Sequence, residues 1–483
     1  MRYLHRATTE KGFIDLHNHT DLSYGKEMGK MNLTPLQLLE EMREYADTFN
    51  KVVTFSITDH NDIIPNRIIM KEINSNPEKY KNIRYIPGVE YSVCADSIGV
   101  CFDDNGNQQP IIKDNRVHLL AYGMDDHNPN IEYLNMLMSN SNKFMIKVDE
   151  RFPAIKLGNI IFSSRHWLKK KKIFVGLDDF RKHCPLNDAN YEKTIENIEK
   201  YFTLDLGLNG EDIKDWKKFI SDYWNVAKHT KADIMEVMDY VEQAGGYSVL
   251  AHPLAYTPSD AFQAIAKQDN PDVRNAQYKG IAFDDKSYKS MNSDEKRRNF
   301  RCMENYYDLI YRKLSIDAKN PITGKKIQGI VGHELLHPLN QTNPYKFQVL
   351  MQTGDKYGLY TTGGSDSHGD LYQYCIPSRI AGAFVQRYDS NYDPKISAYS
   401  LLFCKFVDDY YSSIRTGERL DRKLGRFAKD QMVVLKTNEI TEKFYNMAQF
   451  EEVVFTSFLR KKQSPVSDKK DGYEEAEEQS FAL

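Results

Sequence analysis

Short apolar runs that lead into chemically reactive residues recur along this chain. Each run is only a few residues long, and a histidine, aspartate or glutamate lies within it or shortly after it. Apolar runs of this length suit strands of a parallel sheet that are buried on both faces. The runs and their reactive residues are 13–16 with His17, 52–57 with Asp59 and His60, 83–86 with Glu90, 117–122 with His118, 247–250 with His252, and 359–362 with Asp366 and His368.

Helical patterns separate several of these predicted strands. Thr34 and Pro35 are typical of a helix start, where Thr caps the first turn and Pro fits its backbone. Residues 234–244 have a helical pattern that ends at Gly245 and Gly246. Strands that alternate with helices predict an α/β fold built on a parallel sheet or barrel. In such folds the reactive side chains at the strand ends meet on one rim.

Two long segments interrupt this alternation. Residues 125–232 are rich in Asn, Lys and Tyr, with helical patterns over 191–201 and 212–227. Residues 259–326 are charged and mostly helical in pattern, and we interpret both segments as insertions over the rim of the core. Residues 401–462 are predicted to form a C-terminal extension. The acidic segment 463–483 is predicted to be a disordered tail, because it holds few apolar residues.

Composition restricts the cellular setting and the partners. With a net charge of −3, the chain has no global basic field that would attract nucleic acid or an anionic membrane. Any contact with nucleic acid therefore requires a local patch. The six cysteines form no C-x-x-C pair, and the sequence contains no apolar signal core and no long apolar span. These features predict a cytoplasmic protein with reduced thiols and no membrane-spanning segment.

His17 and His19 are the first indication of a metal centre. In an extended segment, residues two apart point to the same side, so both imidazoles can bind one ion. A His-x-His pair alone is a weak signal. Further histidines and carboxylates lie at the other strand ends: Asp59, His60, Glu90, His118, His252, Asp366 and His368. Their shared placement is hard to attribute to chance, and imidazoles mixed with carboxylates suit Zn²⁺, Mn²⁺ or Fe²⁺.

The ordered motifs resemble those of the polymerase and histidinol phosphatase (PHP) superfamily of metal-dependent phosphoesterases. The segments that carry the resemblance are DLHNHT, SITDHND, PGVEYS, HLLAYG, VLAHP and GGSDSHG. The resemblance implies an α/β fold, a distorted, TIM-like (β/α)7 barrel that binds two or three divalent metal ions (Zn, Mn or Fe). Residues 1–124, 233–258 and 327–400 would then form the three parts of the barrel, with the two insertions between them.

The resemblance also implies how the ligands divide among the ions. The sets are His17, His19, Glu90 and Asp366 for one ion, Glu90, His118 and His252 for a second, and His60 and His368 for a third. Family members often have a further Asp or His shortly after the His-x-His pair, where this chain has Tyr24 or Gly25. Either Asp21 or Glu27 substitutes there, or the third site is weak.

Glu90 and Asp59 are the predicted catalytic residues. Closely spaced divalent ions lower the pKa of a shared water and hold phosphoryl oxygens, so hydrolysis needs no protein nucleophile. Glu90 would bridge two ions, and Asp59 is expected to orient His60 or a neighbouring ligand. The sequence identifies no general acid.

Residues 333–337 match the H-E-x-x-H pattern of zinc proteases. That pattern binds zinc only on a continuous helix. Gly332 and Pro338 flank it, and residues 329–332 have the pattern of a short strand, so His333 and His337 are not expected to bind an ion as a pair. Either Glu334 or His337 has a role at the rim of the site, or the segment is structural.

A basic run lies in the first insertion. Its cations are Arg165, Lys169, Lys170, Lys171 and Lys172, and Trp167 lies among them. Cations beside an aromatic ring can bind the phosphate backbone of a nucleic acid, and a solvated helix face is the alternative.

The leading hypothesis is metal-dependent hydrolysis of phosphoester bonds. The substrate would be a nucleotide or nucleic acid, which the long insertions favour, or a small phosphomonoester. One alternative is a non-catalytic PHP-like scaffold or binding module, which the intact main ligand set disfavours. A zinc protease is a remote alternative.

Overall fold

The computed structural model describes a mixed α/β fold. The described residues are 13–23, 33–50, 52–102, 105–138, 145–146, 155–185, 191–222, 225–226, 231–259, 262, 292–337, 344–364, 366, 406–420 and 422. The predicted tail at 463–483, most of the 401–462 extension and much of the second insertion lie outside them.

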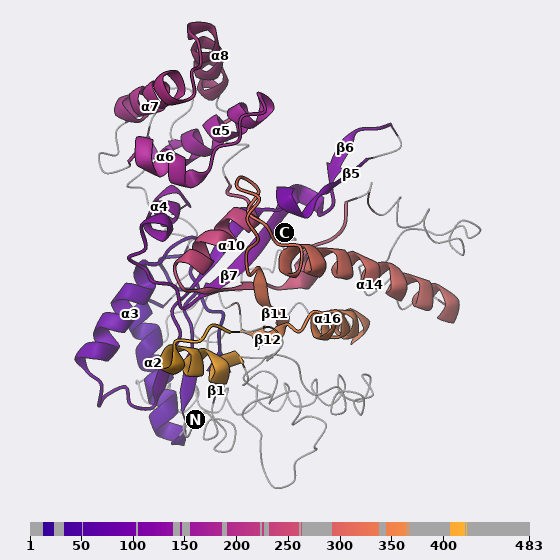
Figure 1. Ribbon diagram of the computed structural model, residues 1–483. Helices are drawn as coiled ribbons and strands as arrows, with labels where there is room; N and C mark the ends of the chain where they lie inside the picture. Colours follow the sequence, from indigo (N-terminus) through magenta and orange to yellow (C-terminus); the bar gives the residue numbers. More distant parts are fainter. Residues whose placement is uncertain are drawn as a thin grey trace, which may run out of the picture.

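Two sheets form the core (Figure 1). One is parallel, in the order β1-β2-β3, and the other has the order β12-β11-β10-β7-β4. The strands are β1 (Phe13–Asp15), β2 (Val53–Phe55), β3 (Ile83–Tyr85), β4 (Gly88–Cys94), β7 (Arg116–Tyr122), β10 (Tyr247–Leu250), β11 (Ile330–Leu336) and β12 (Tyr360–Gly363). Two small hairpins pair β5 (Val100–Phe102) with β6 (Gln108–Pro110), and β8 (Met145–Ile146) with β9 (Ile155–Lys156).

Strand β7 corrects the expectation of parallel strands throughout. It runs antiparallel to both of its neighbours, β4 and β10. Antiparallel neighbours need no crossover helix, and the described part of the segment from β4 to β7 holds the β5–β6 hairpin and the short helices η2 (Asp96–Ile98) and η3 (Lys113–Asn115). Apolar runs alone do not specify strand direction, so the sequence pattern could not reveal this reversal.

Hydrogen bonds connect the two sheets at two places. Leu16 N–H after β1 donates to Gly363 O of β12 (3.1 Å), and Glu90 N–H of β4 donates to Thr58 O after β2 (3.2 Å). These are isolated bonds rather than paired strands. The described residues therefore establish an α/β fold but not the closed barrel that the resemblance implies.

The helices confirm most of the helical patterns. They are α2 (Pro35–Phe49), α3 (Ile64–Ser75), α4 (Pro129–Met138), α5 (Leu157–Lys170), α6 (Leu177–His183), α7 (Tyr191–Lys200), α8 (Gly210–Ser221), α10 (Ile234–Gln243), α14 (Ser293–Ser315) and α16 (Pro344–Lys356), with short turns η5 (Tyr201–Asp205) and η6 (Pro253–Ala255). Thr34 caps α2 through reciprocal bonds with Gln37, and Asp233 caps α10. Helix α8 ends at Ser221, earlier than its pattern suggested.

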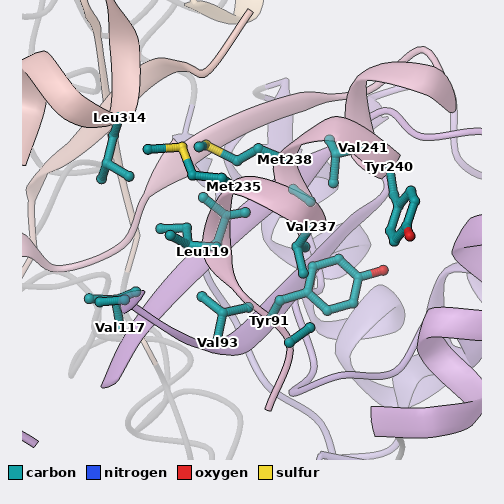
Figure 2. Close-up of a cluster of buried hydrophobic side chains, with 14 of the residues drawn as sticks. Tyr91, Val93, Val117, Leu119, Met235, Val237, Met238, Tyr240, Val241 and Leu314 are labelled. Carbon is teal, nitrogen blue, oxygen red and sulfur yellow. The ribbon is translucent and has the colours of Figure 1, made fainter. Parts of the chain in front are cut away.

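Helix α10 packs on one face of the five-stranded sheet and shields that face from solvent. Figure 2 shows Tyr91 and Val93 of β4 and Val117 and Leu119 of β7 against the apolar side of α10. Because strand side chains alternate, the opposite face of β4 and β7 carries Glu90 and His118. Among the described helices, none is both long and apolar enough to cross a membrane.

Candidate metal centre

The ends of six strands bring the predicted ligands together. His17 and His19 follow β1, His60 follows β2, His252 follows β10 and Asp366 follows β12. Glu90 lies within β4, and His118 lies near the start of β7. The reversal of β7 explains the last position, because the start of an antiparallel strand lies at the same edge as the ends of its neighbours: Ala251 N–H, just past β10, donates to His118 O (3.2 Å).

Four side chains form the first ligand group: His17, His19, Glu90 and Asp366. His17 Nε2 lies 3.2 Å from His19 Nε2, 3.2 Å from Glu90 Oε2 and 3.3 Å from Asp366 Oδ1. His19 Nε2 lies 3.2 Å from Glu90 Oε2 and 3.1 Å from Asp366 Oδ1. Ligands at zinc-like bond lengths around a tetrahedral ion are about 3.3 Å apart, so these spacings match the edges of a coordination shell.

Glu90 also faces a second group. Its Oε1 lies 2.7 Å from His118 Nδ1 and 3.0 Å from His252 Nε2, and its Oε2 lies 3.1 Å from His60 Nδ1. His60, Glu90 and His118 satisfy the spacing of an ion site. The structure therefore places His60 beside His118, whereas the resemblance assigns it to a third ion with His368. His368 lies outside the described residues.

The charges in the cluster are strongly coupled. Burial alone would raise the pKa of Glu90, but the imidazoles of His60, His118 and His17 outweigh it and hold that pKa well below its usual range. Burial alone would lower the pKa of His19, but the carboxylates of Asp366 and Glu90 beside its Nε2 raise it to about 9. Burial lowers the pKa of His118 despite Glu90.

These residues fit a bound cation. Glu90 Oε2 is fully buried and has no hydrogen-bond partner, although three imidazole nitrogens lie within 3.2 Å of it. A buried carboxylate oxygen that accepts no hydrogen bond is costly, and a cation coordinated by that oxygen removes the cost. The neighbouring nitrogens then act as ligands. Ion binding by these residues stays a prediction, and the geometry supports it.

Glu334 holds His17 and His252 in place through two hydrogen bonds. Its Oε1 accepts a hydrogen bond from His17 Nδ1 (2.9 Å), and its Oε2 accepts one from the backbone N–H of His252 (2.8 Å). Burial alone would raise the pKa of Glu334, but His17 and His337 lower it, so the carboxylate is ionised and can only accept. It therefore fixes the tautomer in which His17 Nε2 carries the lone pair that would bind an ion.

The H-E-x-x-H segment is a strand, so the prediction that it is not a zinc-protease helix is confirmed. Residues 330–336 form β11. His333 points away from the cluster to the hydroxyl of Tyr311 (2.8 Å), and burial lowers its pKa to about 3. An irregularity in the β11–β12 pairing precedes His337, whose Nε2 lies 3.2 Å from Asp366 Oδ2. The two imidazoles do not meet.

Three supporting side chains were not anticipated. Ser23 Oγ accepts from the backbone N–H of His60 (3.0 Å) and lies 3.1 Å from His19 Nδ1. The Tyr256 hydroxyl accepts from His118 N–H (2.8 Å) and lies 3.4 Å from His252 Nδ1. Ser92 Oγ lies 3.3 Å from His118 Nε2. Their closeness in sequence to predicted ligands was the only available signal.

Other predicted residues lie at the margin or beyond the described chain. Asp59 is buried against Thr20, whose N–H it accepts at 2.6 Å, and lies 3.9 Å from His19 Nδ1. Burial raises its pKa to about 6. Asp59 thus lies behind His19, whereas it was expected to orient His60 or a neighbouring ligand. Its catalytic role stays a prediction. Asp21 is described but belongs to none of the ligand groups. Glu27 lies outside the described residues.

The basic run divides into a buried and an exposed part. Arg165 was a candidate substrate-binding cation, but its side chain is only 14% exposed and its guanidinium pairs with the buried Glu236 (2.7 and 2.8 Å), so substrate binding by Arg165 stays a prediction that this pairing does not support. Helix amphipathicity explains this, because Arg165 lies on the inner side of α5. Lys169 pairs with Asp96 (3.1 Å) and Lys171 with Asp212 (2.7 Å), and Lys170 and Lys172 are exposed. Substrate binding by these four lysines stays a prediction.

Metal-free protein is expected to lose stability as the pH rises from 6.5 to about 8. The folded-state pKa of His19 is about 9 against an ordinary 6.5, and the pKa values of His17 and His252 are also raised. The stability they contribute is complete below pH 6.5 and is lost as the pH rises toward 9. Urea unfolding in chelator at both pH values measures it. Equal stability at the two pH values would contradict the proposed coupling.

Comparisons with known proteins give little further guidance. No protein-family profile matches the sequence, and no curated protein matches it. Four chains among the solved structures match. One is an amidohydrolase from Chromobacterium violaceum with bound sulfate and no metal: it is 16% identical, with 75% of this chain and 89% of that chain covered and a TM-score of 0.32. Another, from Bifidobacterium adolescentis, is provisionally assigned as a metal-dependent phosphoesterase: it is 16% identical, with 76% and 90% covered and a TM-score of 0.31. At such TM-scores the similarity carries no argument, and the candidate site rests on its own geometry.

Proposed function

We propose that this protein hydrolyses phosphoester bonds at a centre of two or more divalent metal ions, zinc, manganese or iron, held around Glu90. One observation carries the proposal: five imidazoles and two carboxylates converge on one buried point with the spacings of coordination edges. Ions bound there would polarise a phosphoryl oxygen and supply a nucleophile from water. The isolated hydrogen bonds between the two sheets are compatible with a barrel of PHP type.

The side chains of this chain divide the remaining work. Glu334 and Ser23 hold His17 and His19 in fixed orientations. The side chains of Asp366 and His118 are 21% and 23% exposed, whereas His17 and His19 are fully buried. A phosphoryl group would therefore enter the cluster between Asp366 and His118.

A second candidate rests on Ser92. Ser92 Oγ, His118 and Glu90 form a Ser-His-Glu series with spacings of 3.3 Å and 2.7 Å, which is the geometry of an activated serine nucleophile. In the metal-dependent reading, His118 Nε2–H instead donates to Ser92. We prefer the metal-dependent reading, because Glu90 also faces His17, His19, His60 and His252. A serine hydrolase would not need these four histidines.

A substrate panel separates the two readings. The purified protein would be stripped with chelator, reloaded with Zn²⁺, Mn²⁺ or Fe²⁺, and assayed on a phosphomonoester, a phosphodiester, single-stranded DNA and RNA, and a carboxyl ester. We expect phosphoester hydrolysis that chelator abolishes and metal restores, with Ser92→Ala reducing it only modestly. Chelator-resistant hydrolysis that Ser92→Ala abolishes would establish the serine reading. No hydrolysis by any loaded form would favour the scaffold.

A further inference from the structure

The face of the sheet that carries Glu90 and His118 continues outward past the metal cluster. On β7, Val117 and Leu119 point into the core (Figure 2), so His118 and Arg116 share the other face. The register pairs Arg116 with Cys94 and His118 with Ser92. At about 3.3 Å per residue, Arg116 lies about 7 Å beyond His118, on the exposed side of the centre.

A second cation joins Arg116 at this position. Cys94 N–H donates to Ala232 O (2.9 Å), and the Cys94 thiol lies 4.0 Å from Lys231 O, which places Lys231 beside the end of β4. Burial and the neighbouring charge of Arg116 lower the pKa of Lys231 to about 8. Arg116 and Lys231 are therefore close enough to interact electrostatically.

Neither cation is neutralised. Among the described residues, neither the Arg116 nor the Lys231 side chain forms an ion pair or a hydrogen bond. The nearby carboxylates are committed elsewhere: Asp96 binds Lys169 (3.1 Å) and Asn115 (2.6 Å), and Asp233 accepts from the N–H groups of Ser97 and Met235 (both 2.9 Å). Two like charges held together without a counter-charge are unfavourable, unless an anion binds between them.

We propose that Arg116 and Lys231 form a subsite for a second phosphoryl group of the substrate, next to the one that is cleaved. This rests on the proposed function, since it assumes that the cleaved group sits at the metal cluster. The subsite makes substrates with two or more phosphates the preferred class, either a small molecule or a nucleic acid strand. Lys169, paired with Asp96 just beyond, would extend the same basic surface for a strand.

Binding of thymidine nucleotides to metal-free protein tests the subsite without any turnover. The ligands are pT, with one phosphate, pTpT, with two, and a strand of about eight nucleotides, measured by calorimetry in chelator at low and moderate salt. Wild type should bind pTpT about tenfold or more tightly than pT, because charge-assisted hydrogen bonds to the second phosphate are added. A binding gain that is complete at pTpT indicates a small substrate, and a further gain with the strand indicates nucleic acid.

The variants Arg116→Gln, Lys231→Gln and their combination should remove most of the gain of pTpT over pT. They should also flatten the salt dependence of strand binding by about 0.7 in log–log slope per lost phosphate contact. The matched control is Lys71→Gln with Lys81→Gln, two exposed cations elsewhere that lose the same charge. Equal affinity of wild type for pT and pTpT would overturn the proposal, as would equal losses for both ligands or an equal effect of the control. Absence of hydrolysis would refute the proposed function, and the measured difference in affinity between pT and pTpT would not depend on it.

Discussion

Replacing Glu90 with glutamine is expected to lower phosphoester hydrolysis by about a thousandfold or more. Glutamine keeps the size of the side chain but removes the negative charge that His17, His19, His60, His118 and His252 all face. The neutral amide does not replace the carboxylate charge that the histidines face. The affinity for cations should therefore fall together with the rate of hydrolysis. Measurement of kcat/KM and of bound metal per chain tests both effects together.

The matched control is Glu78→Gln, an exposed glutamate in the turn after α3 that belongs to none of the ligand groups. It should leave the rate and the metal content unchanged. The circular dichroism spectrum of the Glu90 variant should match that of wild type, since the substitution is nearly isosteric. A Glu90→Gln protein that keeps most of its activity would show that the chemistry lies elsewhere.

Gly364→Ala is expected to destabilise the fold by about 3 kcal/mol or more and to abolish hydrolysis. Gly364 follows β12 at the point where it passes the His17 backbone. A methyl group there would overlap the Cβ and backbone N of His17 and lie 2.7 Å from its Cα. Backbone cannot swing aside as a flexible side chain can, so β1 and β12 would separate and His17 would leave Asp366. Urea unfolding and the hydrolysis rate measure the two effects.

Gly210→Ala is the corresponding control, because a methyl group at Gly210 meets no atom within 4 Å and the residue opens α8. It should leave stability unchanged or raise it slightly, since alanine favours a helix more than glycine does. If Gly364→Ala behaved like Gly210→Ala, the close approach of β12 to His17 would be wrong.

Much of the candidate site could be predicted because its chemistry is local in sequence. His17, His60, His252 and Asp366 each follow an apolar run, and burial of such runs as strands places those residues at one edge. The grouping of His17 with His19, Glu90 and Asp366 followed from the resemblance, and the spacings in the structure agree with it.

The rest depends on contacts between distant segments, which periodicity does not encode. The direction of β7 depends on pairing with β4 and β10. The pairing of Arg165 with Glu236 joins residues of two helices, so a basic run gave no indication that its first member was mostly buried and paired. Lys231 lies in no motif, and contacts of Cys94 with residues 231–233, distant in sequence, bring it to Arg116.

The reversed strand β7 has a consequence for the evolution and engineering of this chain. The segment from β7 to α10 leaves the sheet at Tyr122, which pairs with Gly88, and returns at Asp233, which pairs with Cys94 at the other end of β4. These points are about 20 Å apart, the length of β4. The segment is therefore a bridge between opposite ends of the sheet rather than a removable appendage. Deleting it would remove Lys231 and would require a linker of about six extended residues in its place, because a tight turn would pull α10 away from the end of β4.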